Sequence, residues 1–155
     1  MKENQGRQVQ KIIIRNLNRK IKVNPARLKR FIRRTLQYKG EGDAGLSLLL
    51  VNDPKIKELN EKYLNRSCPT DVLAFSSREG EGIGLNDWLG DIVVSTETAA
   101  RQAKALKTDI DGEIYLYLTH GLLHLLGRHH YTGKEREKMR REETKIIKEF
   151  YKVDG

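Results

Sequence analysis

The segment His120-Gly-Leu-Leu-His124-Leu-Leu-Gly127-Arg-His-His130 contains all four histidines of the 155-residue chain. Its four leucines point in several directions around a helix, so this helix is expected to lie at the centre of the fold. On a helix, residues four apart share one face and are separated by about 6 Å of rise. His120 and His124 can therefore present imidazole nitrogens to the same point in space.

Gly127 and the third histidine complete the spacing of a metal site. Gly127 lets the chain leave the helix in a left-handed turn that a residue with a Cβ would resist, and this turn can bring His130 back toward the other two. Three neutral imidazoles suit zinc and leave a fourth tetrahedral position for water, as in catalytic sites. We predict one zinc per chain, bound by His120, His124 and His130. Nickel, cobalt and copper also accept three imidazoles, so the metal used in the cell stays open.

The spacing H-x-x-x-H-x-x-G-x-x-H matches that of the metzincin peptidases except at one position. The general-base glutamate expected after the first histidine is Gly121 here. A zinc ion with three histidine ligands can bind hydroxide at neutral pH without that base, so hydrolysis stays possible. The missing glutamate weakens a peptidase interpretation, because there it passes protons to a poor amine leaving group.

Length predicts a single domain over residues 1–155, large enough to bury its own core. Given the histidine motif, it is expected to be a metal-dependent hydrolase domain. Cys68 is the only cysteine, which excludes an intramolecular disulfide and fits a reducing compartment. The first ten residues lack the apolar core of a signal peptide, and no run approaches the roughly 18 apolar residues of a membrane span. We therefore expect a cytoplasmic protein that does not bind membranes.

The chain is basic, with 30 lysines and arginines against 21 acidic residues and a formal net charge of +9. Such an excess favours phosphate-bearing partners such as nucleic acids. Part of it lies on one face of the helix expected after Asn24-Pro25, opposite an apolar stripe: Arg27, Lys29, Arg30, Arg33 and Arg34. This face either contacts phosphates or only meets solvent, and the sequence does not separate the two possibilities.

Hydrophobic patterning predicts four strands, at 11–15, 46–51, 72–75 and 91–94. Capping residues and apolar stripes predict helices that begin at Asn24-Pro25, at Asp53-Pro54, after Ser95 or Thr96, near 109–113 and at 134, the last running to 151. In the second helix, Ile56, Leu59 and Tyr63 are expected to face inward. The glycine-rich segment 80–84 is expected to be a mobile loop, because it lacks the Gly-Lys-Ser/Thr ending of a phosphate-binding loop.

The predicted helices do not alternate strictly with the strands. The expected fold class is therefore α+β, with a small mixed four-stranded sheet packed with about five helices and the histidine-bearing helix at the centre. The order of the strands within the sheet is not determined by these patterns.

A candidate for a positively charged residue that binds a phosphate substrate lies in the segment Asn65-Arg66-Ser-Cys-Pro69-Thr70-Asp71. Arg66 lies between a helix and a strand, and a guanidinium near the metal would bind phosphate oxygens that gain charge in the transition state. An ordinary surface arginine is the alternative. Thr70 and Asp71 are expected to bond to nearby backbone groups where the strand begins.

The histidine motif, Asn65-Arg66, the run Pro69-Thr-Asp-Val-Leu-x-Phe75 and Leu89-Gly-Asp-Ile92 together resemble the YbeY family of bacterial rRNA-maturation endoribonucleases. The resemblance spans nearly the whole chain. It implies zinc binding by His120, His124 and His130, with Arg66 as the catalytic arginine that lines the cleft. It further implies metal-dependent cleavage of single-stranded RNA in rRNA maturation and ribosome quality control, with the ribosome or ribosome-associated proteins as partners.

One position departs from that family. An acidic residue usually comes just before the third histidine, whereas Arg128-His129 stand there in this chain. His129 is therefore an alternative third ligand, although His130 has the expected spacing. The candidates for proton transfer are Glu113, Asp71 and Asp91, and the sequence does not choose among them.

Two other functions stay open from the sequence. A metalloprotease-like hydrolase is supported by the histidine spacing and opposed by Gly121 and the basic charge. A ribosome-associated RNA-binding protein with a structural metal is the other alternative. RNA affinity that falls steeply with salt would fit both this binding protein and a nuclease, so it does not distinguish between them.

Overall fold

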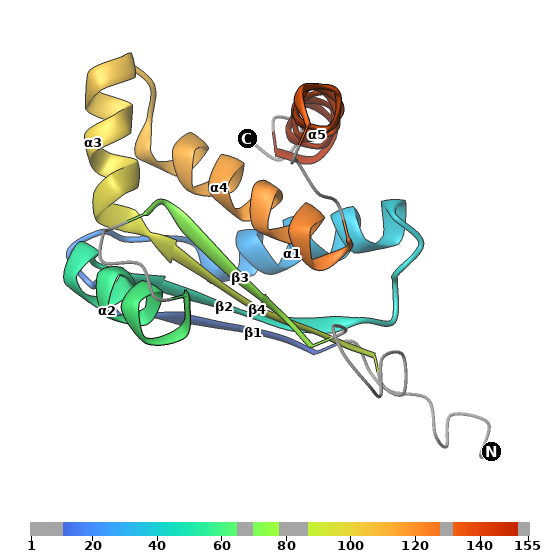
Figure 1. Ribbon diagram of the computed structural model, residues 1–155, viewed down its shortest axis with the longest axis horizontal. Coiled ribbons are helices and arrows are strands. Elements are labelled where there is room, and N and C mark those ends of the chain that lie inside the picture. The colour runs from blue at the N-terminus through green and yellow to red at the C-terminus, as the bar shows by residue number, and fades with distance from the viewer. Residues whose placement is uncertain (1–10, 65–69, 78–86, 128–131, 152–155) are drawn as a thin grey trace.

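The computed structural model describes residues 11–64, 70–77, 87–127 and 132–151 (Figure 1). Four sites discussed above lie outside these residues: Cys68, the glycine-rich segment 80–84, Arg66, and the pair His129 and His130. Among the described residues, none of the helices has the length and apolar character needed to cross a membrane.

One four-stranded mixed sheet forms the base of the fold, in the order β1-β2-β4-β3. Strands β1, β2 and β4 are parallel, and β3 is an edge strand antiparallel to β4. The strands are β1 (Ile12–Asn16), β2 (Gly45–Val51), β3 (Val72–Ser76) and β4 (Trp88–Ser95). The four predicted strands are confirmed, and β4 begins three residues earlier than expected because Trp88 and Gly90 also pair with β2.

Two of the predicted helix starts agree with side-chain caps in the structure. Asn24 accepts a hydrogen bond from the Arg27 N–H at 3.1 Å, and Ser95 accepts one from the Thr98 N–H at 3.0 Å. A π-helical turn, η1 (Ile147–Tyr151), extends the last helix. The α-helices are α1 (Pro25–Tyr38), α2 (Asp53–Leu64), α3 (Thr96–Leu106), α4 (Ile110–Leu125) and α5 (Gly133–Ile146).

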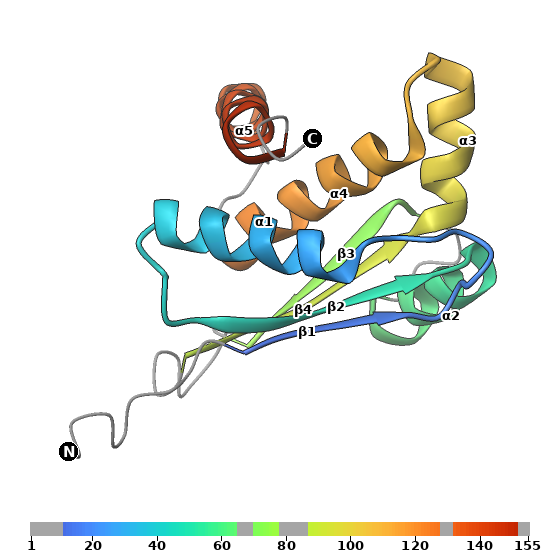
Figure 2. The ribbon, with the colours of Figure 1, turned by 180° about the vertical axis from the view of Figure 1, so that it is seen from behind.

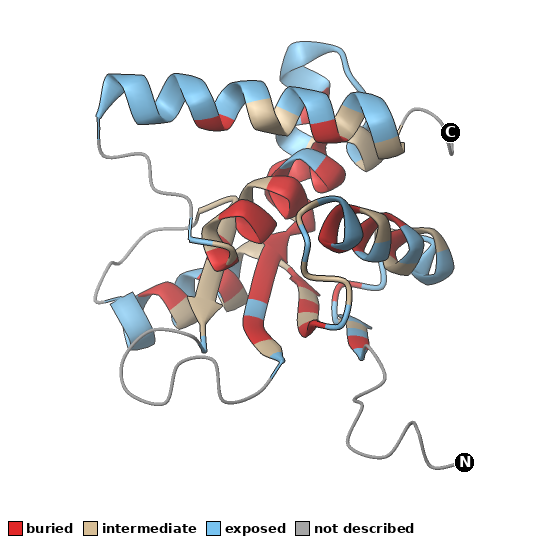
Figure 3. Ribbon diagram, turned by 90° about the vertical axis from the view of Figure 1, so that its right-hand side faces the viewer, coloured by how far each residue is buried: buried red, intermediate tan, exposed pale blue. Residues whose placement is uncertain are grey.

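The helices lie on both faces of the sheet (Figures 1 and 2). Helices α1 and α4 cover one face, α5 lies across them on the outside, and α2 covers part of the other face. Figure 3 shows the buried residues concentrated where α1 and α4 meet the sheet, whereas most of the outer surface of α5 is exposed. Within the described residues, this arrangement confirms the α+β class, the mixed four-stranded sheet and the five helices.

Helix α4 is the central helix of the described fold. Its own side chains are buried on several sides of the helix, including those of Tyr115, Leu118, Leu122 and Leu123, each no more than 1% exposed. It packs against β3, β4, α3 and α5. The expectation of a central histidine-bearing helix is therefore confirmed, and its position follows from burial of apolar side chains, about 1.5–3 kcal/mol for each large one.

The prediction that Tyr63 faces the core is wrong. Tyr63 is 58% exposed, although it lies on the same side of α2 as the buried Ile56. Its ring meets Phe75 at a centroid distance of 5.6 Å. Phe75 belongs to the edge strand β3, so Tyr63 lies over the margin of the sheet and not over its buried centre.

Candidate metal centre

Two of the three predicted ligands face each other at the end of α4. The Nε2 atoms of His120 and His124 are 3.2 Å apart, and the two rings meet at 68° with centroids 4.7 Å apart. Two nitrogen ligands about 2.1 Å from a tetrahedral zinc would be roughly 3.4 Å apart. The imidazole pair therefore has the spacing of two corners of a zinc site, as the helical periodicity predicted.

The end of α4 follows the predicted route. The helix finishes at Leu125, and Gly127 has a φ of +92°, a value that favours glycine. The Gly127 N–H donates to the His124 carbonyl oxygen at 3.0 Å. The chain therefore leaves the helix within one turn of the second ligand, as a third ligand nearby in sequence requires.

Glu143 of α5 contacts His120, one of the two imidazoles, and was not predicted from the sequence. Its Oε2 atom lies 2.5 Å from Nδ1 of His120. This hydrogen bond raises the pKa of His120 above its ordinary value, while burial of the ring acts in the opposite direction. A proton on Nδ1, shared with Glu143, leaves Nε2 to face His124 with its lone pair, the arrangement that a metal ligand needs.

Helical periodicity could have selected Glu143. Met139 and Ile146 are buried, and Glu143 lies between them on the same face of α5. The adjacent Glu142 instead forms an ion pair with Lys39 of α1 at 2.6 Å. A charged residue within an otherwise apolar stripe therefore marked Glu143 as a residue with a polar partner inside the fold.

One of the three candidates for proton transfer, Asp91, lies apart from the other two. Asp91 accepts a hydrogen bond from Ser47 at 2.5 Å and precedes Ile92, which packs against α4. Since successive side chains of a strand alternate between faces, Asp91 faces away from α4 and from the imidazole pair. Asp91 is therefore excluded as a group that acts directly at this centre.

Glu113 and Asp71 line a polar pocket of about 530 Å³ beside α4. The pocket is lined by Thr70, Asp71, Thr98, Arg101, Gln102, Glu113 and Tyr117. Glu113 accepts a hydrogen bond from Thr108 at 3.1 Å and is two turns, about 10 Å of rise, from His120. The charge of Asp71 contributes to raising the pKa of His120, so Asp71 is the candidate with a direct electrostatic effect on the centre.

The basic face of α1 is not a uniform solvent-facing surface. Arg27 donates to Asp111 at 2.8 Å and to the Tyr151 carbonyl oxygen at 3.0 Å. Its guanidinium also lies over the rings of Tyr115 and Tyr151, at 5.1 and 4.5 Å from their centroids. Arg27 therefore joins α1 to α4 and η1, and its charge is paired with that of Asp111 within the fold.

Gly121 has a structural reason for lacking a side chain. A Cβ at this position would lie 2.8 Å from Cγ2 of Ile92, and Gly121 and Ile92 are both buried. Position 121 faces β4, so a glutamate here would enter the apolar layer between α4 and the sheet. The residue that metzincin peptidases use as a base cannot be accommodated at this point of the fold without displacing Ile92.

We expect Gly121→Ala to lower the free energy of unfolding by about 1 kcal/mol. Overpacking against Ile92, about 1–3 kcal/mol, outweighs the gain of roughly 1 kcal/mol from helix propensity. In an Ile92→Ala background the same substitution should instead be stabilising, because the clashing methyl group is gone. Urea unfolding of the four proteins measures this sign change, and equal effects in both backgrounds would contradict the close packing.

Comparison with known proteins identifies the family. The family model described as Endoribonuclease YbeY matches residues 13–151. The chain belongs to the YbeY family of endoribonucleases. Proteins named Endoribonuclease YbeY are 40% identical over 132 residues in Syntrophotalea carbinolica, covering 84% of this chain and 88% of the relative, and 35% identical over 136 residues in Aquifex aeolicus, covering 88% of each. This membership confirms the resemblance seen in the sequence and the expected class of enzyme, a nuclease-type hydrolase.

The fold of the YbeY-family chain is also found in a solved structure. The solution structure of TM1509 from Thermotoga maritima matches with a TM-score of 0.57 and 23% sequence identity, over 94% of this chain and 93% of that one. The predicted ligand His130, its alternative His129 and the predicted catalytic residue Arg66 lie outside the described residues. Their roles therefore stay predictions, whereas His120 and His124 are brought together.

Proposed function

We propose that this YbeY-family chain is a zinc-dependent endoribonuclease that cuts single-stranded RNA. Its proposed substrate is ribosomal RNA, cut in the cytoplasm during rRNA maturation and ribosome quality control, with the ribosome or ribosome-associated proteins as partners. The observation that supports the proposal best is the pair of imidazoles, with Nε2 atoms 3.2 Å apart and one ring bonded to Glu143.

In this proposal His120, His124 and His130 bind the zinc ion, with residues 1–155 forming one domain. When bound, zinc supplies a water molecule that ionises near neutral pH and positive charge beside the reacting phosphate. Glu143 orients His120 through Nδ1. Arg66 binds phosphate oxygens, and the net charge of +9 attracts the RNA strand.

Substituting Glu143 with glutamine is expected to weaken zinc binding by roughly 10–100-fold. Glutamine keeps the shape of the side chain but removes the carboxylate that orients and polarises His120. Competition with a chromophoric zinc chelator measures the affinity without depending on RNA cleavage. Glu142→Gln is the matched control, because Glu142 pairs with Lys39 instead, and it should keep the affinity of the wild type. Equal affinity in both variants would remove Glu143 from the centre.

The peptidase alternative is disfavoured by the environment of Gly121, which faces Ile92 and leaves no space for a glutamate base. The alternative of an RNA-binding protein with a structural metal makes a different prediction about turnover. We would incubate the zinc-loaded protein with an end-labelled single-stranded RNA, with the same sequence in a duplex, and with a peptide library. Chelator-sensitive internal cuts in the single strand alone support the proposal. Chelator-sensitive peptide cleavage with intact RNA, or RNA binding without any cleavage, would contradict it.

A further inference from the structure

A pocket lined by two arginines of α5 lies directly beside His120. His120, Arg136, Met139, Arg140 and Glu143 line a pocket of about 150 Å³. This volume is below the roughly 300–1,000 Å³ of a complete small-molecule site, so the pocket suits one group of a larger ligand. The neighbouring carboxylate of Glu143 is already bonded to His120, which leaves the two arginines as the charged groups that face the pocket with no partner described above.

Arg136 and Arg140 have the geometry of a phosphate-binding pair. They are four residues apart on α5, so they share one face with about 6 Å of rise between them. Arg140 lies one turn before Glu143, the residue that contacts His120. Both side chains are exposed, and a guanidinium can bind two oxygens of one phosphate through its planar fork.

The charge of this pair is not neutralised within the part of the chain that the structure describes. The nearby Glu142 forms an ion pair with Lys39, Glu143 is bonded to His120, and Glu135 belongs to the capping box of α5. Neither Arg136 nor Arg140 forms an ion pair with any described carboxylate. Two adjacent exposed cations that form no ion pair with a described carboxylate attract an anion.

We propose that Arg136 and Arg140 form a subsite that binds a backbone phosphate of the RNA strand, next to the phosphate at the imidazole pair. The inference rests on the proposed function, because it takes single-stranded RNA as the ligand. It assigns to α5 two tasks, orientation of His120 by Glu143 and placement of the strand by the arginines. The two arginines are binding residues, distinct from Arg66.

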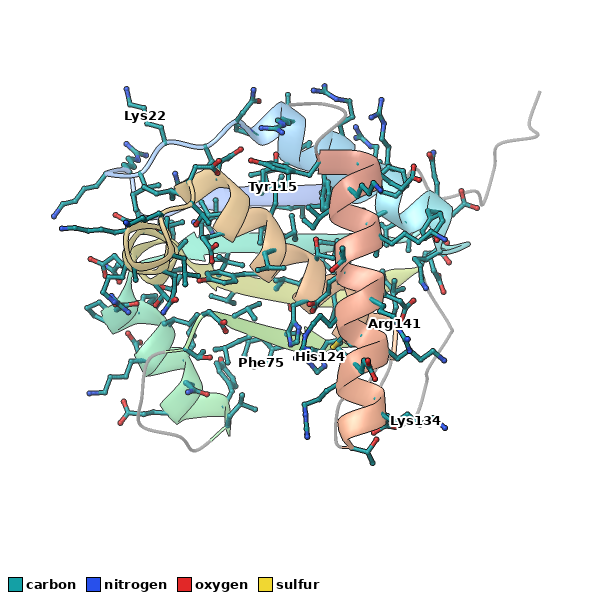
Figure 4. The ribbon with its side chains drawn as sticks, turned by 90° about the horizontal axis from the view of Figure 1, so that it is seen from above. Lys22, Phe75, Tyr115, His124, Lys134 and Arg141 are labelled. Atoms are coloured by element: carbon teal, nitrogen blue, oxygen red, sulfur yellow. The ribbon has the colours of Figure 1, made fainter. Side chains whose placement is uncertain are left out.

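The test compares three proteins with a fluorescein-labelled single-stranded RNA of twelve nucleotides. They are the zinc-loaded wild type, Arg136→Gln/Arg140→Gln, and a control, Lys138→Gln/Arg141→Gln, which removes the same charge from the opposite face of α5. Figure 4 shows Arg141 and His124 on opposite sides of this helix. Fluorescence anisotropy, read at the start of each incubation before cleavage proceeds, gives Kd at several salt concentrations, and a gel of each sample measures how much RNA is cut at that time and later. Zinc content and circular dichroism confirm that each variant is folded and loaded.

We expect Arg136→Gln/Arg140→Gln to raise Kd by about tenfold and the control to stay within about twofold of the wild type. The slope of log Kd against log salt should fall by about 0.7 in the first variant, because one phosphate of a single strand is no longer neutralised. Equal Kd values for the two variants would overturn the subsite.

Cleavage by the wild type separates this inference from the proposed function. A wild type that cuts RNA, together with two variants that bind it equally, overturns the subsite alone. A wild type that does not cut RNA, but binds it through Arg136 and Arg140, overturns the proposed nuclease and supports the subsite. A wild type that does not bind the RNA overturns both.

Discussion

Replacing His124 with alanine should abolish both zinc binding and RNA cleavage while the protein stays folded. His124 supplies one of two nitrogens that lie 3.2 Å apart, so its loss leaves His120 without the partner with which it would share a metal ion. The loss of affinity should exceed the roughly 10–100-fold expected for removing a residue that only supports a ligand. Metal analysis of the purified variant and a cleavage assay on the same sample measure the two effects together.

Neighbouring histidines provide matched controls for that variant. His130→Ala should lose zinc as His124→Ala does, whereas His129→Ala should keep it, because His130 has the spacing expected of the third ligand. A His124→Ala protein with the metal content of the wild type would overturn the ligand assignment. The reverse pattern for the adjacent pair would make His129 the third ligand.

Arg66→Ala is expected to reduce the rate of RNA cleavage by at least about 10²-fold while zinc stays bound. This is the scale of removing a group that stabilises charge developing in the transition state. The measurements are single-turnover cleavage rates, zinc content and thermal unfolding. Arg66→Lys keeps the charge but loses the planar fork, so its rate should lie between those of Arg66→Ala and the wild type. Turnover like that of the wild type in Arg66→Ala would remove Arg66 from the mechanism.

The sequence predicted those parts of the fold that depend on local chemistry. Asn24 and Ser95 cap the helices at which they were expected, because a short polar side chain can satisfy a free N–H only at a helix start. The pairing of His120 with His124 depends only on helical geometry. The central position of α4 follows from apolar side chains on several of its sides.

Features that depend on contacts between distant segments could not be predicted in the same way. The bond between Glu143 and His120 requires that α5 cross α4 at a particular height. Periodicity places Glu143 on the apolar face of α5, but it does not give that height or name His120 as the partner. Asp91 was a candidate for proton transfer until the pairing of β4 placed Ile92, and not Asp91, against α4. Tyr63 lies on the expected face of α2, but that face lies over β3, and the sequence did not show that β3 is an edge strand.

Titration of the metal-stripped protein with zinc tests the central claim most directly, namely that the imidazole pair at the end of α4 binds the metal on which RNA cleavage depends. Internal cleavage of an end-labelled single-stranded RNA would be followed at each addition. We predict no cleavage without metal, a rate that rises with added zinc, and saturation at one zinc per chain. Cleavage that is the same in the stripped and zinc-loaded protein, or zinc binding at this stoichiometry without cleavage, would contradict the account.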